Sequence, residues 1–474
     1  MLTTSPSFKE NAHHAMADKG LQKALARTRP QNPAKRVAAV AALPEFEQLR
    51  DIGRDIKNHT LQHLDFYLET WEANVLASGG QVHWTSTADD ARAAVLAICQ
   101  KAGARTVTKG KSMISEELAI NDHLEAHGIE PIETDLGEYI LQIRKEPPSH
   151  IIGPAFHLNR EDWEESFRKV HTHLPADRVF AEKKDIQAEA RTLLRDKFLA
   201  ADVGITGANF LIAETGSSVI VTNEGNGDLT QTLPRVHIVL ASIEKMVPTL
   251  EDAMSLLRLL ARSATGQDFS VYTTFSTGGR RPADLDGPEE YHVVIIDNGR
   301  SGMIGGEFQD MLRCIRCAAC MNHCPVYQTV GGHSYGWVYP GPMGSVLTPS
   351  LIGVDKAGHL PNASTFCGKC ESVCPVKIPL PNMMRHWRER EFERHLSPAS
   401  VRNNLALWAW FARRPSLYRF ATRIAARGMA LLAGKKGRLA SLPLASGWTE
   451  GRDLPAPEGD TFFARYAKMQ RAAK

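Results

Sequence analysis

Apolar residues recur every three or four positions along the first part of the chain. The spacing is clearest between residues 45 and 77, and an earlier segment, FKENAHHAMADKGLQKALARTR, has the same character. This period matches one face of an α-helix. The pattern predicts a helical N-terminal extension over residues 1–80, wrapped on a larger domain.

The pattern changes between residues 81 and 300, where short β-rich runs alternate with helical segments. The run VHWT precedes TADDARAAVLAICQKAG, TVTKG precedes MISEELAINDHLEAHG, and YHVVIIDNG closes the series. Such alternation is typical of a mostly parallel sheet covered on both faces. We therefore predict an α/β domain over residues 81–300. Two apolar runs around residues 214–216 add an antiparallel hairpin within it.

Regular periodicity stops after Gly299, and glycine, proline and cysteine become frequent until Pro381. Small metal-binding domains have this texture because metal–ligand bonds replace part of the apolar core. We predict such a domain over residues 301–382. Its central stretch, GHSYGWVYPGPMGSVLTP, is too long for a simple loop, and we expect it to shield a metal centre rather than to form a docking surface.

Helical periodicity returns over residues 383–474. From residue 385 onward the chain carries 18 Lys/Arg against 7 Asp/Glu, although the net charge of the whole chain is only +3. A basic, aromatic helical surface favours docking to a partner protein, with peripheral membrane contact as the second interpretation. The aromatic and basic residues that alternate here are Trp408, Trp410, Phe411, Tyr418, Phe420, Arg413, Arg414, Arg419, Arg423 and Arg427.

Overall composition adds few constraints. The 474 residues, 43% hydrophobic and 23% charged, are those of an ordinary globular protein with two or three domains. The sequence has no apolar run long enough to cross a membrane, and MLTTSPSFKENAHHAMADKG lacks the apolar core of a secretory signal. We expect a cytoplasmic protein with no transmembrane segment and no nucleic-acid partner.

Cysteine placement points to iron–sulfur chemistry. Seven of the eight cysteines lie between residues 314 and 374, and Cys99 is expected to be a buried helix residue. The first motif, CIRCAACMNHCP, has the C-x2-C-x2-C-x3-C-P spacing of bacterial ferredoxins. Zinc sites usually offer two separated C-x2-C pairs, so this spacing favours an iron–sulfur cubane. Its four thiols belong to Cys314, Cys317, Cys320 and Cys324.

The second motif, CGKCESVCP, lacks the first cysteine of that pattern. Aligning Pro375 with Pro325 places Ser364 at the missing position. In two-cluster ferredoxins the fourth cysteine of each motif binds the other cluster. The rule predicts one cluster bound by Cys314, Cys317, Cys320 and Cys374, and a second bound by Cys324, Cys367 and Cys370.

Three thiolates leave the type of the second cluster open. It is a [3Fe–4S] cluster, or a [4Fe–4S] cluster whose last iron takes Ser364, another oxygen or nitrogen ligand, water or a partner's side chain. We favour two [4Fe–4S] clusters. We expect Ser364 to be a local hydrogen-bonding residue.

Other motifs give weaker signals. The GKS of VTKGKSM has Arg105 where a phosphate-binding loop needs its first glycine, and no G-x-G-x-x-G follows a strand. Polar, glycine-rich turns at residues 214–216, 223–225 and 298–300 are places where an open sheet often binds ligands, although turn formation explains them equally well.

Several segments together resemble the bacterial lactate utilisation protein B family over nearly the whole chain. They are TKGKSMISEELAINDHLEAHGIEPIETDLGEYILQI, GITGANFLIAETGSSVIVTNEGN, CIRCAACMNHCPVY, CGKCESVCPVKIPL and GWTEGRDLPAP. The resemblance implies a lactate-utilisation domain with the α/β fold shared by sugar-phosphate isomerases and CoA transferases. A two-cluster ferredoxin-type α-helical module and a helical C-terminal region would follow it.

The resemblance also implies a function. Members form one component of a three-protein complex that oxidises L-lactate to pyruvate and permits growth on lactate, so two other lactate utilisation proteins are the expected partners. The same seven cysteines carry over as cluster ligands, and the family pattern also lacks an eighth. It assigns neither a catalytic base nor an electron acceptor, so we predict an electron-transfer component of that complex and assign no catalytic base to it.

Three alternatives stay open from the residues. In the first, the chain is an enzyme in its own right, and Arg300 pairs with the carboxylate of a hydroxy acid. In the second, the chain is a redox-responsive scaffold without catalytic function. In the third, the same electron relay serves the oxidation of glycolate or glycerol phosphate.

Overall fold

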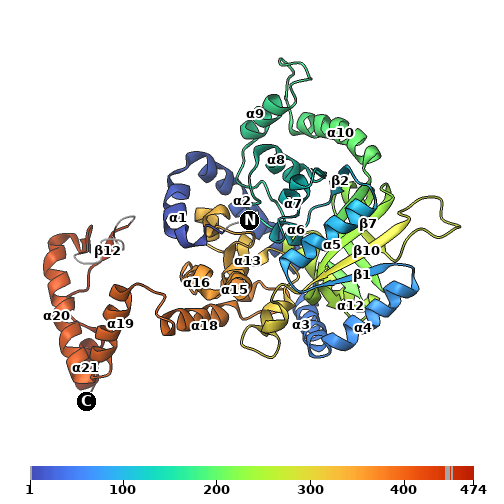
Figure 1. Cartoon of the computed structure of the whole chain (residues 1–474). Helices are drawn as coiled ribbons and strands as arrows, with labels where there is room; N and C mark the ends of the chain where they lie inside the picture. The colour runs from blue at the N-terminus through green and yellow to red at the C-terminus, as the bar shows by residue number, and fades with distance from the viewer. Residues whose placement is uncertain (1–2, 443–448, 450–451, 474) are drawn as a thin grey trace. The chain divides into compact units, whose positions relative to one another are not determined.

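The computed structural model describes residues 3–442, 449 and 452–473 (Figure 1). The chain divides into two compact units, Met1–Glu391 and Phe392–Lys474. The first unit contains the N-terminal helices, the six-stranded and four-stranded sheets and all seven clustered cysteines.

A six-stranded, wholly parallel sheet forms the centre of the first unit, in the order β1-β10-β7-β4-β2-β3. Alternate residues of the central strands enter different cores: Val239 and Val293 lie in one, Ile238 and Val294 in the other. Both faces are therefore covered, which confirms the predicted α/β class. The strands are β1 (Gln81–Thr85), β2 (Thr106–Lys109), β3 (Glu130–Glu133), β4 (Val203–Gly207), β7 (Val236–Ser242) and β10 (Glu290–Ile296).

Helices connect these strands, and their starts are encoded locally. The side chain of Thr87 accepts a hydrogen bond from the backbone N–H of Asp90, and Thr249 caps Asp252 in the same way. Such caps satisfy backbone donors that the first helical turn leaves free. The helices are α5 (Ala88–Lys101), α6 (Met113–Glu117), α7 (Ile120–Ala126), α8 (Leu136–Arg144), α9 (Arg160–Val170), α10 (Lys183–Ala200), α11 (Asn226–Thr232) and α12 (Leu250–Ala264).

The predicted hairpin is present and belongs to a second sheet. Strands β5 (Phe210–Ile212) and β6 (Ser217–Thr222) pair antiparallel, and β8 (Met246–Val247) and β9 (Tyr272–Ser276) extend them to the order β8-β5-β6-β9. Gly216 at the turn has φ +69°, and a Cβ there would lie 2.6 Å from the backbone nitrogen of Val75. Only glycine fits this approach.

The N-terminal extension is helical, as predicted, and it packs against the cysteine-rich segment, residues 301–382 (Figure 1). Arg29 donates to the carbonyl oxygen of Gln328 at 2.7 Å, and Arg36 to that of Val373 at 3.0 Å. The extension therefore covers the segment that carries the cysteines. Its elements are η1 (Ser5–Ser7), α1 (Phe8–Ala17), α2 (Lys19–Ala41), α3 (Phe46–Gln62) and α4 (Leu64–Ala77).

The cysteine-rich segment consists of short helical turns around a buried insert. Tyr339 is 2% exposed, and every residue from Gly341 to Pro349 is buried. The insert is thus core, as expected of a shield, and does not form a docking surface. The elements are η3 (Ser301–Met303), η4 (Gln309–Arg313), α13 (Ala319–Asn322), α14 (Tyr327–Val330), η5 (His333–Tyr335), α15 (Gly341–Ile352), α16 (Val354–Ala357), η6 (Leu360–Asn362), α17 (Lys369–Ser372) and α18 (Leu380–Glu393).

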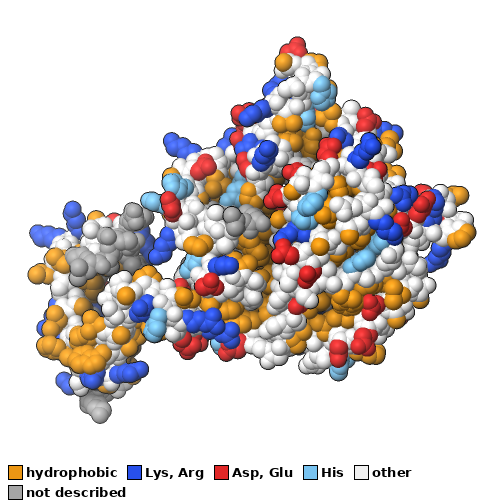
Figure 2. Space-filling model, in the orientation of Figure 1, with side chains coloured by type: hydrophobic (Ala, Val, Ile, Leu, Met, Phe, Trp, Pro, Cys, Tyr) orange, Lys and Arg blue, Asp and Glu red, His pale blue; other side chains and the backbone are white. Residues whose placement is uncertain are grey.

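The second unit is helical and exposes large apolar side chains. Trp408 is 60% exposed, Phe420 64% and Phe462 73%. Figure 2 shows hydrophobic and basic side chains side by side on this unit. Among the described residues, none of the helices has the length and apolar character needed to cross a bilayer. The elements are α19 (Ala399–Ala412), α20 (Pro415–Ala433), η7 (Gly434–Lys436), β11 (Arg438–Leu439), β12 (Leu454–Pro455) and α21 (Phe462–Ala472).

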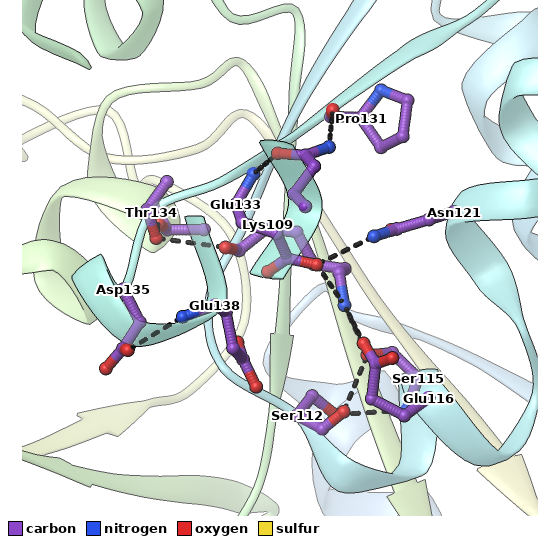
Figure 3. Close-up of polar contacts among 12 residues, drawn as sticks. Lys109, Ser112, Ser115, Glu116, Asn121, Pro131, Glu133, Thr134, Asp135 and Glu138 are labelled. Carbon is purple, nitrogen blue, oxygen red and sulfur yellow. Dashed lines mark hydrogen bonds and ion pairs between the residues drawn. The ribbon is translucent and has the colours of Figure 1, made fainter. Parts of the chain in front are cut away.

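A buried polar cluster lies at the end of β2 (Figure 3). The Nζ of Lys109 lies 2.8 Å from a carboxylate oxygen of Glu116 and 2.7 Å from one of Glu133. Glu138 is 3% exposed, and its two carboxylate oxygens have no hydrogen-bond partner among the described residues. Burial, and then the charge of Glu133, raise the pKa of Glu138 well above its usual range.

We expect Glu138→Gln to change the pH dependence of stability. The pKa of Glu138 is raised in the folded state. Its contribution to stability is therefore fully present below the unfolded pKa of 4.5 and is lost as pH rises through the folded pKa. Glutamine cannot ionise, so the stability of the variant should increase relative to that of the wild type as pH rises. Thermal unfolding between pH 5 and pH 9 measures this. The control is Glu125→Gln, because Glu125 is exposed. A difference in stability between Glu138→Gln and the wild type that does not change with pH would contradict the prediction.

Candidate functional site

Four thiols form what we call the inner group: Cys314, Cys317, Cys320 and Cys374. Burial, and then the neighbouring thiols of the other three, raise the pKa of Cys320 well above that of a free cysteine. Burial and then Cys374 raise the pKa of Cys317. Cys374 belongs to the second motif, yet it lies beside the cysteines of the first.

The remaining three thiols, Cys324, Cys367 and Cys370, form the outer group. Burial and then Cys324 raise the pKa of Cys370 to about 12, with a smaller effect from Cys367. Cys367 is exposed, whereas Cys317 and Cys374 are buried. The two groups adjoin, since the charge of the Cys370 thiolate also raises the pKa of Cys320. The crossing rule groups the cysteines in the same way, and the assignment of ligands to clusters stays a prediction.

The backbone repeats between the two motifs. Positive φ angles occur at Arg316 and Phe366, each nine positions before the motif's proline, and at Ala318 and Gly368, each seven before it. The four-residue helices α13 and α17 follow at equivalent places. When the two motifs are aligned in this way, Ser364 has the position that Cys314 has in the first motif. The Oγ of Ser364 accepts a hydrogen bond from the backbone N–H of Phe366 at 3.2 Å, which is the local role expected of it.

The thiol groups fit iron–sulfur clusters as a donor set. All eight cysteines are free of disulfides, and Cys99 is buried in α5, as predicted. Thiols whose pKa is raised by burial carry little thiolate until a metal ion takes up the sulfur charge. In the part of the chain that the structure describes, no three His, Cys, Asp or Glu side chains are grouped to hold a single metal ion. Thiolates around a cubane bind different irons, so they need not approach one another as ligands of one ion do.

Cations surround the inner group, and the sequence analysis missed them. Arg50, on α3, donates to the carbonyl oxygen of Cys374 at 3.0 and 2.7 Å. The charge of Arg36 acts on the thiol of Cys317, and the thiol of Cys314 acts on the guanidinium of Arg316. Positive side chains near a cluster offset its negative charge and tune its potential. Of these three arginines only Arg316 lies inside a cysteine motif, so only its proximity to the thiols could have been predicted from the local sequence.

A cavity of about 300 Å³ lies next to the inner group. It opens where β2, β4 and β7 end, and we call it the strand-end cavity. Open α/β sheets bind ligands at this edge. Residues from both the α/β domain and the cysteine-rich segment line it, among them Lys111, Asn209, Ser242, Lys245, Arg316 and Tyr339.

Of the polar turns proposed as ligand sites, only residues 223–225 contribute to this cavity, through Asn223 and Glu224. Glu214 instead accepts a hydrogen bond from the backbone N–H of Leu250 at 3.0 Å. Asn298 donates to Glu117 at 2.7 Å. These two turns have structural roles, which agrees with the alternative explanation by turn formation.

Arg300 is not available to a substrate carboxylate. Its guanidinium is fully buried and donates to both carboxylate oxygens of Glu117, at 2.9 and 2.6 Å, while its Nε lies 3.1 Å from Glu244. Glu244 also pairs with Arg316 at 3.1 Å, and the hydroxyl of Tyr339 donates to Glu117 at 2.7 Å. The hypothesis that Arg300 binds substrate is therefore wrong. Its network joins the α/β domain to the cysteine-rich segment.

Comparisons with known proteins agree with this architecture. A LUD domain matches residues 68–296, a 4Fe-4S dicluster domain residues 310–378, and the C-terminal domain of lactate utilisation protein B residues 384–471. A solved DUF162 family protein from Deinococcus radiodurans is 16% identical and covers 49% of this chain and 98% of that one. Its TM-score of 0.26 is too low to establish a shared fold.

Curated relatives extend the similarity over nearly the full chain. Lactate utilization protein B of Lysinibacillus sphaericus is 42% identical and covers 98% of this chain and 97% of that one. Those of Geobacillus kaustophilus (44% identical; 92% and 91% covered) and Bacillus subtilis (41%; 99% and 97%) are similar to the same extent. The chain belongs to the lactate utilisation protein B family, and it is an iron–sulfur component of lactate utilisation.

Proposed function

We propose that this chain is the electron-transfer component of a complex that oxidises L-lactate to pyruvate and thereby permits growth on lactate. The observation that carries the proposal is the arrangement of the seven free thiols in two adjoining groups. The inner group lies next to a cavity, and the outer group includes the exposed Cys367. This order suits transfer from a substrate side to a surface side.

The proposal gives each group of cysteines a role. Cys314, Cys317, Cys320 and Cys374 would hold one cluster, and Cys324, Cys367 and Cys370 the second, most simply as two [4Fe–4S] clusters. When bound, such clusters accept and release one electron each. Oxidation of lactate to pyruvate releases two electrons and two protons, so two one-electron sites match the electron count. The electrons leave to an acceptor outside this chain.

The proposal places the chain in the cytoplasm with two other lactate utilisation proteins as partners. The exposed apolar and basic helices α19 and α20 offer a surface for such a partner. This chain has no assigned catalytic base, so the bond-breaking step is expected to need the partners.

Anaerobic purification with iron and sulfide counts, followed by EPR before and after addition of L-lactate, tests the proposal. We expect L-lactate to reduce the clusters only when the partner proteins are present. Glycolate and glycerol 3-phosphate serve as alternative donors in parallel samples. If the complete complex leaves both clusters oxidised with L-lactate but reduces them with one of the other donors, the relay serves that donor instead.

A further inference from the structure

Two cations that line the strand-end cavity have donor atoms from which no described residue accepts a hydrogen bond. Lys245 follows β7 and lines the cavity, and no hydrogen bond or ion pair joins its Nζ to any described residue. Arg316 is 11% exposed, and its Nη1 has no hydrogen-bond partner among the described residues although its Nη2 pairs with Glu244. Lys245 is half-buried, whereas the Nη1 of Arg316 is buried. A buried donor normally finds an acceptor, so Arg316 points to an acceptor that binds in the cavity, within which Lys245 is a second free donor.

The charges around the cavity are segregated. Glu244, Arg300, Arg316 and Cys314 act electrostatically on Lys245, whereas Asp135 and Lys111 act on Glu224. Glu244 already has Arg300 and Arg316 as partners, so Lys245 is the cation in excess at its end. An anionic ligand would therefore bind with its charged group at the Lys245 end.

The remaining lining suits a small ligand with a second polar group. The Oδ1 of Asn209 accepts a hydrogen bond from the backbone N–H of Val221 at 3.0 Å, and no described residue accepts from its amide nitrogen. Small-molecule sites have volumes of about 300–1,000 Å³, and this cavity of about 300 Å³ is at the lower limit. Its size and donors fit a short acid with one hydroxyl or oxo group.

We propose that the strand-end cavity is the binding site for a small 2-hydroxy monocarboxylate, held by the amine of Lys245 under the positive charge of Arg316. The inference rests on the proposed function and assigns the substrate site to this chain. Arg316 lies between two cysteines of the inner group, so it is both a cavity wall and a neighbour of the first cluster's ligands. A single guanidinium thus joins the two sites.

Binding of L-lactate to the full, anaerobically purified chain tests the inference directly. We expect saturation-transfer NMR to detect L-lactate on the wild type and to show at least about tenfold weaker affinity for Lys245→Gln, because a charge-assisted hydrogen bond is lost. Lys245→Arg should keep most of the binding. Propane-1,2-diol, which has the same skeleton without the carboxylate, should not bind.

The control variant is Lys101→Gln, whose side chain is 69% exposed and pairs with Glu290 away from the cavity lining. Iron content and circular dichroism verify that each variant is folded. Equal affinity of the wild type and Lys245→Gln overturns the inference. It also fails if the isolated chain does not bind L-lactate while the complete complex still reduces its clusters with it, a result that leaves the proposed function intact. Binding without reduction in the complete complex contradicts only the proposed function.

Discussion

Cys374→Ala should remove the cluster that the first motif binds, although Cys374 belongs to the second. Its thiol lies with Cys314, Cys317 and Cys320, so we expect the same residual EPR spectrum from Cys374→Ala as from Cys317→Ala. The iron and sulfide content should fall to about half of that of the wild type, because one of two clusters is lost.

Two variants give this experiment its controls. Cys324→Ala should lose the other cluster, and its residual spectrum should therefore differ from that of Cys374→Ala. Cys99→Ala should keep the full iron content, since Cys99 is buried in α5, away from both groups. If Cys374→Ala instead matched Cys370→Ala, each motif would bind its own cluster and the crossing assignment would be wrong.

Arg300→Met should destabilise the chain by about 3–5 kcal/mol, the usual cost of removing one partner from a buried ion pair. The guanidinium is fully buried and neutralises Glu117, which has no other cation within ion-pairing distance among the described residues. After the substitution the Glu117 carboxylate keeps only its hydrogen bonds from Asn298 and Tyr339. Chemical denaturation followed by circular dichroism measures the loss.

The matched control is Arg258→Met, because Arg258 pairs with Glu45 at 2.7 Å on the surface, with the two side chains 37% and 47% exposed. Exposed pairs contribute about 0–1 kcal/mol. Glu117→Gln in the Arg300→Met background should recover part of the lost stability, since it removes the unpaired charge. Equal losses of unfolding free energy in Arg300→Met and Arg258→Met would show that the buried network stabilises the chain no more than an exposed ion pair does.

Local patterns were sufficient for the sheet and for the cysteine motifs. Strand and helix periods alternate within about twenty residues, so the parallel sheet and the hairpin around Gly216 follow from neighbouring positions. The spacing before Pro325 and Pro375 also identified Ser364 as the place of the missing cysteine. The boundaries at residues 80, 300 and 382 stay predictions.

Long-range contacts limited the prediction of the site. Lys245 and Arg316 are 71 positions apart, and nothing in the residues around Lys245 indicates that a cysteine motif will lie beside it. Arg300 looked available because it follows a strand in a glycine-containing turn, whereas its partner Glu117 is 183 positions away. Burial of a charge depends on such distant partners, which a single sequence does not reveal.

The hydrogen bonds of Arg50 to Cys374 have a consequence for biosynthesis, because they span 324 positions. At about 5–20 residues per second, a ribosome needs roughly 15–65 s between these two residues. During most of that time α2 and α3 have been synthesised, whereas the segment that they cover has not. The inner thiol group cannot close until that segment emerges, so iron loading belongs to the last stage of synthesis. A nascent chain stalled before Cys374 would leave the other three thiols of the inner group without their fourth member and would expose them, with an uncovered apolar helix face, to oxygen and to proteases.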